Sequence, residues 1–281
     1  MKIGIVGLGL IGGSFAKAIS FRTKHEVYGA DCNAESVKKA LADGAICGIL
    51  QQRTLKDMDM TILALPPKAT VSFFNENAAF FGDSTVFDTC GVKQYVLNGV
   101  KAKAAEHNVC FIGVHPMAGR EYSGYDYSQE TLFDRASFIV VDENVPEARL
   151  LAVCALAEEI GFRHVEHTTA ARHDRVIAYT SQLAHVVSNG YIQSKTLAEK
   201  DGFCAGSFAD MTRVAKIDAK LWTELFLLNR EPLLNEMEEL MHNLEKLRDA
   251  VRDSDAAALQ NILQQGNDRK VQSLEKEKQF R

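Results

Sequence analysis

Apolar residues in the first part of the chain form short runs that alternate with longer stretches of helical spacing. This alternation is typical of a parallel sheet whose strands are joined by crossover helices. Several runs are apolar on successive residues, as strands buried on both faces must be. The predicted strands are Lys2–Val6, Glu26–Ala30, Met60–Ala64, Thr85–Asp88, Val109–Val114, Ser137–Val141 and Arg163–Glu166. The predicted helices between them are Gly12–Phe21, Ala34–Asp43, Lys93–Glu106 and Pro146–Ile160.

The strand signal ends near His167, and helical periodicity then continues almost without a break to Lys278. The pattern predicts an α/β fold class: an N-terminal Rossmann-type, doubly wound and mostly parallel sheet, followed by an all-helical C-terminal domain. We place the two domains at residues 1–167 and 168–281, which suits a chain of 281 residues.

One helical stretch carries an apolar seam with alternating spacings of four and three residues, like that of a helix pair or short coiled coil. Packing between two subunits and packing within one bundle both account for it. The seam consists of Leu233, Met237, Leu240, Leu244, Leu247 and Val251.

The segment Val176–Ser194 contains no Asp, Glu, Lys or Arg and approaches the length of a membrane span. Its polar residues are too numerous to be left in lipid without partners, so we expect a buried helix of a soluble bundle and no membrane partner. These residues are Thr180, Ser181, Gln182, His185, Ser188 and Asn189.

Charge and cysteine content narrow the function classes. With 32 basic and 37 acidic residues the net charge is -5, and no long basic block occurs, so a nucleic-acid partner is disfavoured and a small-molecule substrate is expected. The six cysteines include no Cys-x-x-Cys pair, which argues against a zinc site and against a disulfide framework. We expect reduced thiols, no metal and a cytoplasmic location.

The residues Gly7, Gly9 and Gly12 have G-x-G-x-x-G spacing between a predicted strand and a predicted helix, as a dinucleotide site requires. Gly7 permits a tight turn, Gly9 leaves space for a pyrophosphate, and Gly12 lets helix and strand pack closely. The amides near Leu10 and Ile11 would then face the phosphates at the favourable end of the helix dipole. The alternative is a glycine-rich turn that binds nothing.

Asp31 ends the second predicted strand, where a carboxylate accepts hydrogen bonds from the adenosine ribose. Because that charge repels a 2′-phosphate, and Cys32 and Asn33 supply no guanidinium, NAD is the expected cofactor rather than NADP. A methyltransferase, which also holds a ribose with an acidic residue, is a minor alternative. Leu65 follows the third long strand at the carboxyl edge, where open α/β sheets bind ligands, and is a further candidate for cofactor contact.

His115 follows another predicted strand and therefore reaches the same edge, beside the expected nicotinamide. Histidine with a pKa near neutral can accept the proton of a hydroxyl while hydride leaves the same carbon. A purely structural role is the alternative.

The helical region supplies candidate substrate ligands. Arg213 offers a planar, permanently charged guanidinium for a carboxylate, although a salt bridge to Asp210 is an equal alternative. Gln182 and His185 fall on one helix face with Ser181 and Asn189, which would either line a cleft or form a polar seam inside the bundle.

His115-Pro116-Met117-Ala118-Gly119 followed by Glu121, together with Asp210-Met211-Thr212-Arg213 and Trp222, resembles the prephenate dehydrogenase family of tyrosine biosynthesis. The resemblance implies NAD-dependent oxidative decarboxylation of prephenate, or of its amino analogue arogenate. It also implies that His115 bonds the ring hydroxyl, that Arg213 binds a substrate carboxylate, and that His185 and Glu121 belong to the substrate pocket. Family members pair their helical domains, so a homodimer is expected.

Two positions depart from that family. Gly91 stands where members often have serine, and Thr89, Cys90, a backbone amide or a water could replace that hydroxyl. The stretch Ser181-Gln182-Leu183-Ala184-His185 stands where members often have Ser-His-Leu-Pro-His, which leaves prephenate and arogenate both open as substrates.

Two other functions also share these features. A β-hydroxyacid or imine-reducing dehydrogenase would have the same glycine loop and helical domain. A sensor that binds NAD without turnover would have the same loop, and the missing hydroxyl at Gly91 is compatible with it.

Overall fold

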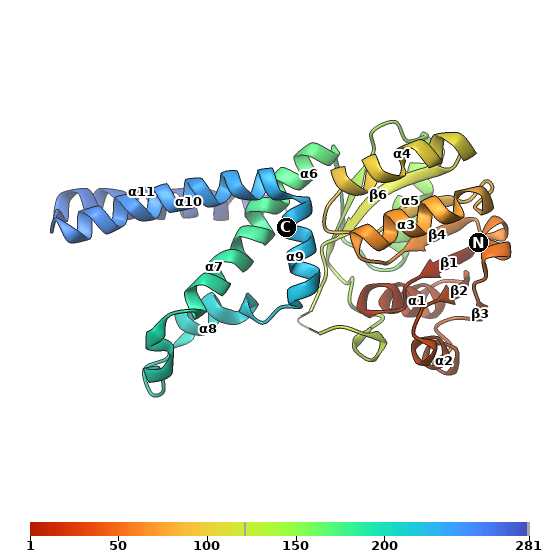
Figure 1. Ribbon diagram of the computed structural model, residues 1–281, viewed down its shortest axis with the longest axis horizontal. Coiled ribbons are helices and arrows are strands. Elements are labelled where there is room, and N and C mark those ends of the chain that lie inside the picture. Colours follow the sequence, from red (N-terminus) through yellow and green to blue (C-terminus); the bar gives the residue numbers. More distant parts are fainter. Residues whose placement is uncertain (121, 280–281) are drawn as a thin grey trace. The chain divides into compact units, whose positions relative to one another are not determined.

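The computed structural model describes residues 1–120 and 122–279, with side chains up to residue 276 (Figure 1). The chain falls into two compact units, Met1–Arg230 and Glu231–Arg281. The first unit contains the sheet and the helices that follow it directly. The domain boundary expected between residues 167 and 168 therefore lies inside the first unit and stays a prediction.

An eight-stranded sheet with the order β3-β2-β1-β4-β5-β6-β7-β8 forms the centre of the first unit. Neighbouring strands are parallel except β6 and β7, which are antiparallel, so the predicted mostly parallel sheet is confirmed. The strands are β1 (Lys2–Val6), β2 (Glu26–Ala30), β3 (Gly48–Ile49), β4 (Met60–Leu63), β5 (Thr85–Asp88), β6 (Cys110–Pro116), β7 (Ser137–Val141) and β8 (His164–Thr168).

Helices cover both faces of this sheet, as a doubly wound fold requires (Figure 1). One core packs α1 and α5 on the sheet through residues such as Phe15 and Leu156, and the other packs α3 and α4 through Phe74 and Val100. In β1, Ile5 joins the first core and Val6 the second, which explains the unbroken apolar run. These helices are α1 (Leu10–Arg22), α2 (Ala34–Ala42), α3 (Pro67–Asn77), α4 (Gln94–His107) and α5 (Glu147–Glu159).

Two of these elements were not predicted from the sequence. The buried face of α3 includes Thr70 and Asn77 beside Phe74, so its apolar periodicity is weak although the helix is completely formed. The strand β3 has 2 residues, which is too short for any periodic signal.

The uncharged segment that follows the sheet is helical, as expected, but it is not a uniform α-helix. A π-helical turn, Ala178–Gln182, separates α6 (Ala170–Ile177) from α7 (Leu183–Ile192). The helices α8 (Gly206–Thr212) and α9 (Ala219–Leu228) complete the first unit. Over the part of the chain that the structure describes, no helix is both long and apolar enough to cross a membrane.

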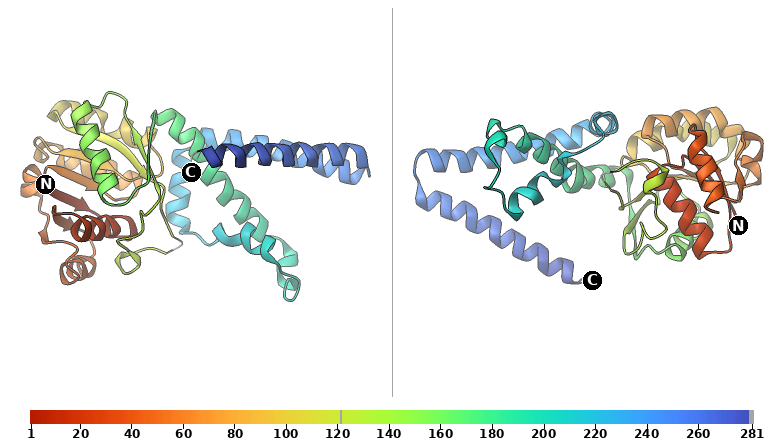
Figure 2. Two further views of the ribbon diagram at one scale, coloured as in Figure 1. Left: turned by 180° about the vertical axis from the view of Figure 1, so that it is seen from behind. Right: turned by 90° about the horizontal axis from the view of Figure 1, so that it is seen from below.

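The second unit is a pair of helices that are joined by a short turn and diverge from it (Figure 2). It consists of most of α10 (Arg230–Arg252) and of α11 (Ala256–Gln279). Within the apolar seam predicted on α10, Leu244 and Val251 are 53% and 62% exposed. These two residues of the seam therefore lie exposed in a single chain, whereas Leu247 between them is half-buried.

Candidate active site

The glycine loop between β1 and α1 has the shape that a dinucleotide requires. Gly7 has a φ of +91°, and a Cβ atom there would lie 2.4 Å from the carbonyl oxygen of Ala64. A Cβ atom on Gly12 would lie 1.8 Å from the carbonyl oxygen of Gly7, so neither position accepts a side chain. A Cβ atom on Gly9, by contrast, would have no atom of any other described segment within 4 Å. Space is thus left directly in front of the first amides of α1, where a pyrophosphate would fit.

The loop also occupies the point where the strand order reverses. The strand β1 lies between β2 and β4, and open α/β sheets bind ligands at such a switch point. Leu65, the second residue after β4, lies beside the loop, because its Cδ2 would be 3.0 Å from a Cβ atom on Gly7. The structure therefore brings Leu65 together with the glycines.

Asp31 connects the end of β2 to the same loop. Its Oδ2 accepts a hydrogen bond of 2.6 Å from the amide of Leu8, and its Oδ1 accepts one of 2.7 Å from the amide of Asn33. A carboxylate oxygen can accept more than one hydrogen bond, so this partly exposed group can still receive a ribose hydroxyl. Asn33 itself caps α2, because its side-chain oxygen accepts from the amide of Glu35.

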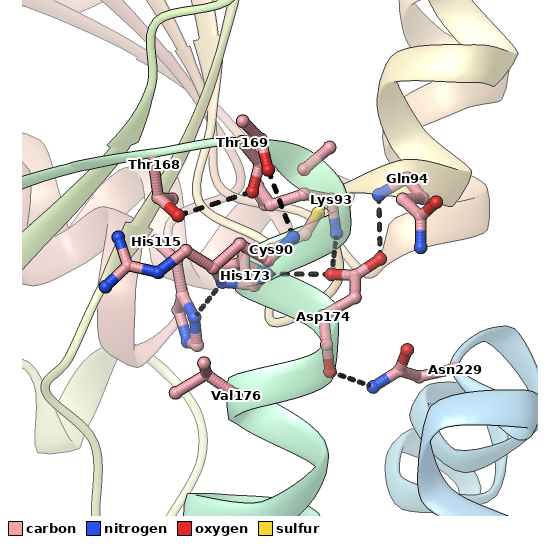
Figure 3. A network of polar contacts seen from close by, with 12 residues as sticks. Cys90, Lys93, Gln94, His115, Thr168, Thr169, His173, Asp174, Val176 and Asn229 are labelled. Atoms are coloured by element: carbon pink, nitrogen blue, oxygen red, sulfur yellow. Dashed lines mark hydrogen bonds and ion pairs between the residues drawn. The ribbon is translucent and has the colours of Figure 1, made fainter.

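His115, the sixth residue of β6, lies at the carboxyl edge and is the first member of a polar chain (Figure 3). Its Nδ1 lies 2.9 Å from Nε2 of His173 on α6, and Nδ1 of His173 lies 2.7 Å from Oδ1 of Asp174. The Asp174 carboxylate also accepts hydrogen bonds of 2.7 and 2.9 Å from the backbone amides of Lys93 and Gln94. It therefore fixes α6 to the start of α4.

Sequence reasoning did not identify His173 or Asp174. Their only signal was an adjacent His-Asp pair early in the helical region, and nothing in the spacing connected that pair to His115. The chain folds so that β6 and α6 meet, which places both residues behind the histidine.

The pKa shifts of the three hydrogen-bonded side chains favour two neutral imidazoles beside an ionised carboxylate. Burial lowers the pKa of His115 well below its ordinary value, and the nearby His173 and Lys93 lower it further. Burial also lowers the pKa of His173, although its hydrogen bond to Asp174 opposes that shift. Burial alone would raise the pKa of Asp174, but hydrogen bonds from His173 and two backbone amides hold it below its usual value.

A buried ion pair fixes the strand ends on which His115 stands. The fully buried Lys93 ammonium donates to the carboxylate of Asp88 and to the carbonyl of Val114. Asp88 also accepts from the amides of Cys90 and Val114, at 2.9 and 3.2 Å. Because Val114 immediately precedes His115, this network sets the position of the histidine backbone. Removal of one partner would leave a buried charge uncompensated.

The helix α9 covers the carboxyl edge of the sheet. The amide of Lys68, in the first turn of α3 and thus beyond the end of β4, donates a hydrogen bond of 2.8 Å to Glu224. A Cβ atom on Gly91, just after β5, would lie 3.7 Å from Leu225 and 3.8 Å from Nε2 of His115. The ends of β4, β5 and β6 thus face one helix, and Nε2 of His115 points toward Gly91 in that space.

The same helix reaches the candidate substrate ligands of the helical region. His185 donates from Nδ1 to the carbonyl of Val214, at 2.9 Å, and its ring centroid lies 3.6 Å from that of Trp222. Trp222 and Leu225 are three residues apart on α9 and therefore share a face. One face of α9 thus contacts both the surroundings of His115 and those of His185, with Arg213 next to Val214 in the chain.

Gln182 has a different environment. Its buried amide accepts a hydrogen bond of 2.8 Å from Asn229 and donates one of 3.4 Å to the carbonyl of Leu225. Asn229 also donates to the backbone carbonyl of Asp174, at 2.8 Å. The structure therefore places Gln182 in the packing between the π-helical turn and α9. Glu121 lies outside the described residues.

Comparison with known proteins assigns the family. A family model of the prephenate dehydrogenase nucleotide-binding domain matches residues 15–166, and a model of the prephenate dehydrogenase dimerization domain matches residues 169–265. This chain belongs to the prephenate dehydrogenase family. The resemblance read from the histidine and arginine motifs is confirmed, and so is the expected class of enzyme, an oxidoreductase.

Individual relatives cover nearly the whole chain. A cyclohexadienyl dehydrogenase from Zymomonas mobilis is 30% identical over 90% of this chain and 89% of its own length. A prephenate dehydrogenase from Lactococcus lactis is 28% identical over 94% of this chain and 75% of its own length. The crystal structure of prephenate dehydrogenase from A. aeolicus, in complex with hydroxyphenyl propionate and NAD+, has a TM-score of 0.83 and 28% identity, covering 97% of this chain and 98% of that one. These matches confirm the predicted fold class.

Proposed function

We propose that this chain catalyses the NAD-dependent oxidative decarboxylation of prephenate to 4-hydroxyphenylpyruvate in tyrosine biosynthesis. The observation that carries the proposal is the position of His115 Nε2, which faces the space between the strand ends and α9. The names of the Lactococcus and Bacillus subtilis relatives, both prephenate dehydrogenases, favour prephenate over arogenate. The NAD+ named for the A. aeolicus structure supports NAD as the cofactor.

NAD fits the residues of the loop and of the strand ends. When bound, it supplies the acceptor for the hydride. The carboxylate of Asp31 would bind the ribose and repel a 2′-phosphate, which disfavours NADP. The residues proposed to hold NAD are Gly7, Gly9, Leu10, Ile11, Gly12, Asp31 and Leu65.

The side chains of the protein would then act on the substrate. As hydride leaves the ring carbon that bears the hydroxyl, Nε2 of His115 accepts the hydroxyl proton, and a carbonyl forms at that carbon. The ring carboxylate leaves as carbon dioxide, and its bonding electrons complete the aromatic ring. The oxygen of the former carbonyl then takes a proton back from His115 and becomes the phenol hydroxyl of 4-hydroxyphenylpyruvate. Arg213 would hold a substrate carboxylate, with His185 and Glu121 as further pocket residues, whereas Gln182 is bonded within the packing against α9.

We also propose that the chain acts as a homodimer through its helical domain, residues 168–281. The match to a dimerization domain supports this proposal, as do the exposed apolar residues of the seam on α10. Sedimentation of the purified protein at several concentrations tests it, and a monomer at every concentration would contradict it.

The decisive assay compares prephenate and arogenate with NAD and with NADP by absorbance at 340 nm. We expect the largest kcat/KM for prephenate with NAD. Reduction of NAD by short hydroxy acids but not by prephenate would indicate a different dehydrogenase. Tight NAD binding without reduction in the presence of any of these substrates would indicate a sensor.

A further inference from the structure

The hydrogen-bond chain behind His115 determines where its proton lies. An ionised carboxylate only accepts, so the bond between Asp174 and His173 requires the hydrogen of His173 to be on Nδ1. Neutral His173 has one ring hydrogen, so its Nε2 is an acceptor. The contact of 2.9 Å between that Nε2 and Nδ1 of His115 then requires His115 to donate. The remaining nitrogen of His115, Nε2, is left with a free lone pair.

We propose that Asp174 and His173 are positioning residues that hold His115 in the tautomer with Nδ1 protonated and Nε2 able to accept a proton. The catalytic consequence rests on the proposed function, since Nε2 is the nitrogen that faces the substrate space beside Gly91. Without such a partner the proton of an imidazole can occupy either nitrogen, and the hydrogen bond of the other nitrogen decides which one it occupies. With the proton on Nε2, His115 could not act as a base.

The surroundings of Asp174 keep it charged and in a fixed orientation. Each carboxylate oxygen accepts from one backbone amide at the start of α4, so the group cannot rotate without losing both bonds. The positive end of the α4 dipole also favours the negative charge. The charged groups facing the two imidazoles are the ammonium of Lys93 and the carboxylates of Asp88 and Asp174. The ammonium disfavours an imidazolium, so both rings remain neutral while Asp174 stays ionised.

The first variant is Asp174→Asn. An asparagine oxygen in the position of Oδ2 can still accept from the Gln94 amide. An NH2 group in the position of Oδ1 loses the bond with the Lys93 amide and donates to Nδ1 of His173. His173 must then donate from Nε2, His115 must accept at Nδ1, and its proton moves to Nε2. We expect kcat for prephenate to fall about 10²-fold or more, with KM and the Kd for NAD within about threefold of the wild-type values.

Two variants of His173 test the proposal without changing Asp174, whose carboxylate also binds the amides at the start of α4. Glutamine at this position offers a carbonyl oxygen that can accept from Nδ1 of His115, whereas leucine cannot accept at all. We expect His173→Gln to retain activity within about tenfold of wild type and His173→Leu to lose as much as Asp174→Asn. As a control, Asp218→Asn removes an exposed carboxylate that caps α9, and it should leave kcat unchanged.

A second readout needs neither substrate nor cofactor. Nitrogen-15 NMR of histidine-labelled full-length protein distinguishes protonated from bare ring nitrogens, and the spectrum of His115→Asn assigns the His115 signals. We expect a protonated Nδ1 and a bare Nε2 in the wild type and in His173→Gln, and the reverse in Asp174→Asn. A bare Nδ1 in the wild type would overturn the proposal, as would an unchanged tautomer in Asp174→Asn. Failure of prephenate oxidation with the expected tautomers would contradict only the proposed function.

Discussion

A Cβ atom on Gly91 would lie 3.8 Å from Nε2 of His115, an ordinary van der Waals separation. A serine therefore fits here, and its hydroxyl would come within hydrogen-bonding reach of the histidine or of a substrate hydroxyl. Cys90 does not supply that group, because its Sγ bonds Thr70 and the carbonyl of Leu65 instead.

We predict that Gly91→Ser folds normally and raises kcat/KM for prephenate about 2–10-fold, the worth of one net hydrogen bond. Gly91→Ala is the matched control, since it fills the same space without a hydroxyl. Steady-state kinetics and thermal unfolding check both variants. Equal kinetics for the serine and alanine variants would show that the hydroxyl contributes nothing.

Replacement of His115 by asparagine tests the proposed base. Asparagine cannot accept the proton, so kcat should fall by about 10²–10⁴-fold. The glycine loop is unchanged, so NAD should bind with a Kd within about twofold of that of the wild type, as measured by calorimetry. Turnover near the wild-type rate would reject the role of His115.

The pH dependence of stability follows from the lowered pKa values of His115 and His173. The unfolded histidines gain protons near their ordinary pKa of 6.5, whereas the folded ones do so only at lower pH. The free energy of unfolding should therefore be highest above pH 6.5 and should fall as the pH drops below it. Urea denaturation between pH 7.5 and 5 measures this change. His173→Gln, with one titrating group fewer, should show a smaller fall, and an equal fall would contradict the assignment.

Arg213→Gln tests the proposed contact with a substrate carboxylate. Loss of a charge-assisted hydrogen bond should raise KM for prephenate about 10–100-fold while kcat changes less. Arg53→Gln removes the same charge from a short helix next to β3 and serves as the control. An unchanged KM in the Arg213 variant would exclude this residue from the pocket.

Two glycines of the loop should respond differently to alanine. In Gly9→Ala the added methyl group enters open space, so the protein should fold normally but bind NAD at least about tenfold more weakly. In Gly12→Ala the methyl group meets the carbonyl of Gly7, so stability should fall by about 1–3 kcal/mol or more. Gly266→Ala on α11, also in open space, is the control for Gly9. NAD affinity equal to that of the wild type in Gly9→Ala would place the pyrophosphate elsewhere.

The sequence by itself predicted the features that depend on near neighbours in the chain. The glycine loop could be recognised because its strand and helix flank it directly, and Asp31 and His115 because each ends a buried apolar run. Buried strands leave short apolar runs in the sequence, so the strands could be predicted, and with them the residues at the carboxyl edge of the sheet. Where that signal was interrupted by polar buried residues, as in α3, the helix was missed.

Only the tertiary structure decided which side chains support His115. His173 and Asp174 reach it from α6, Leu225 of α9 approaches the neighbouring Gly91, and Lys93 anchors Val114, the residue before it. These contacts join segments that are far apart in the chain. The residues around a single histidine, aspartate or leucine form no local pattern that would indicate such a distant partner. Burial by packing also sets the pKa of His115, and packing arises only when the sheet and the helices assemble.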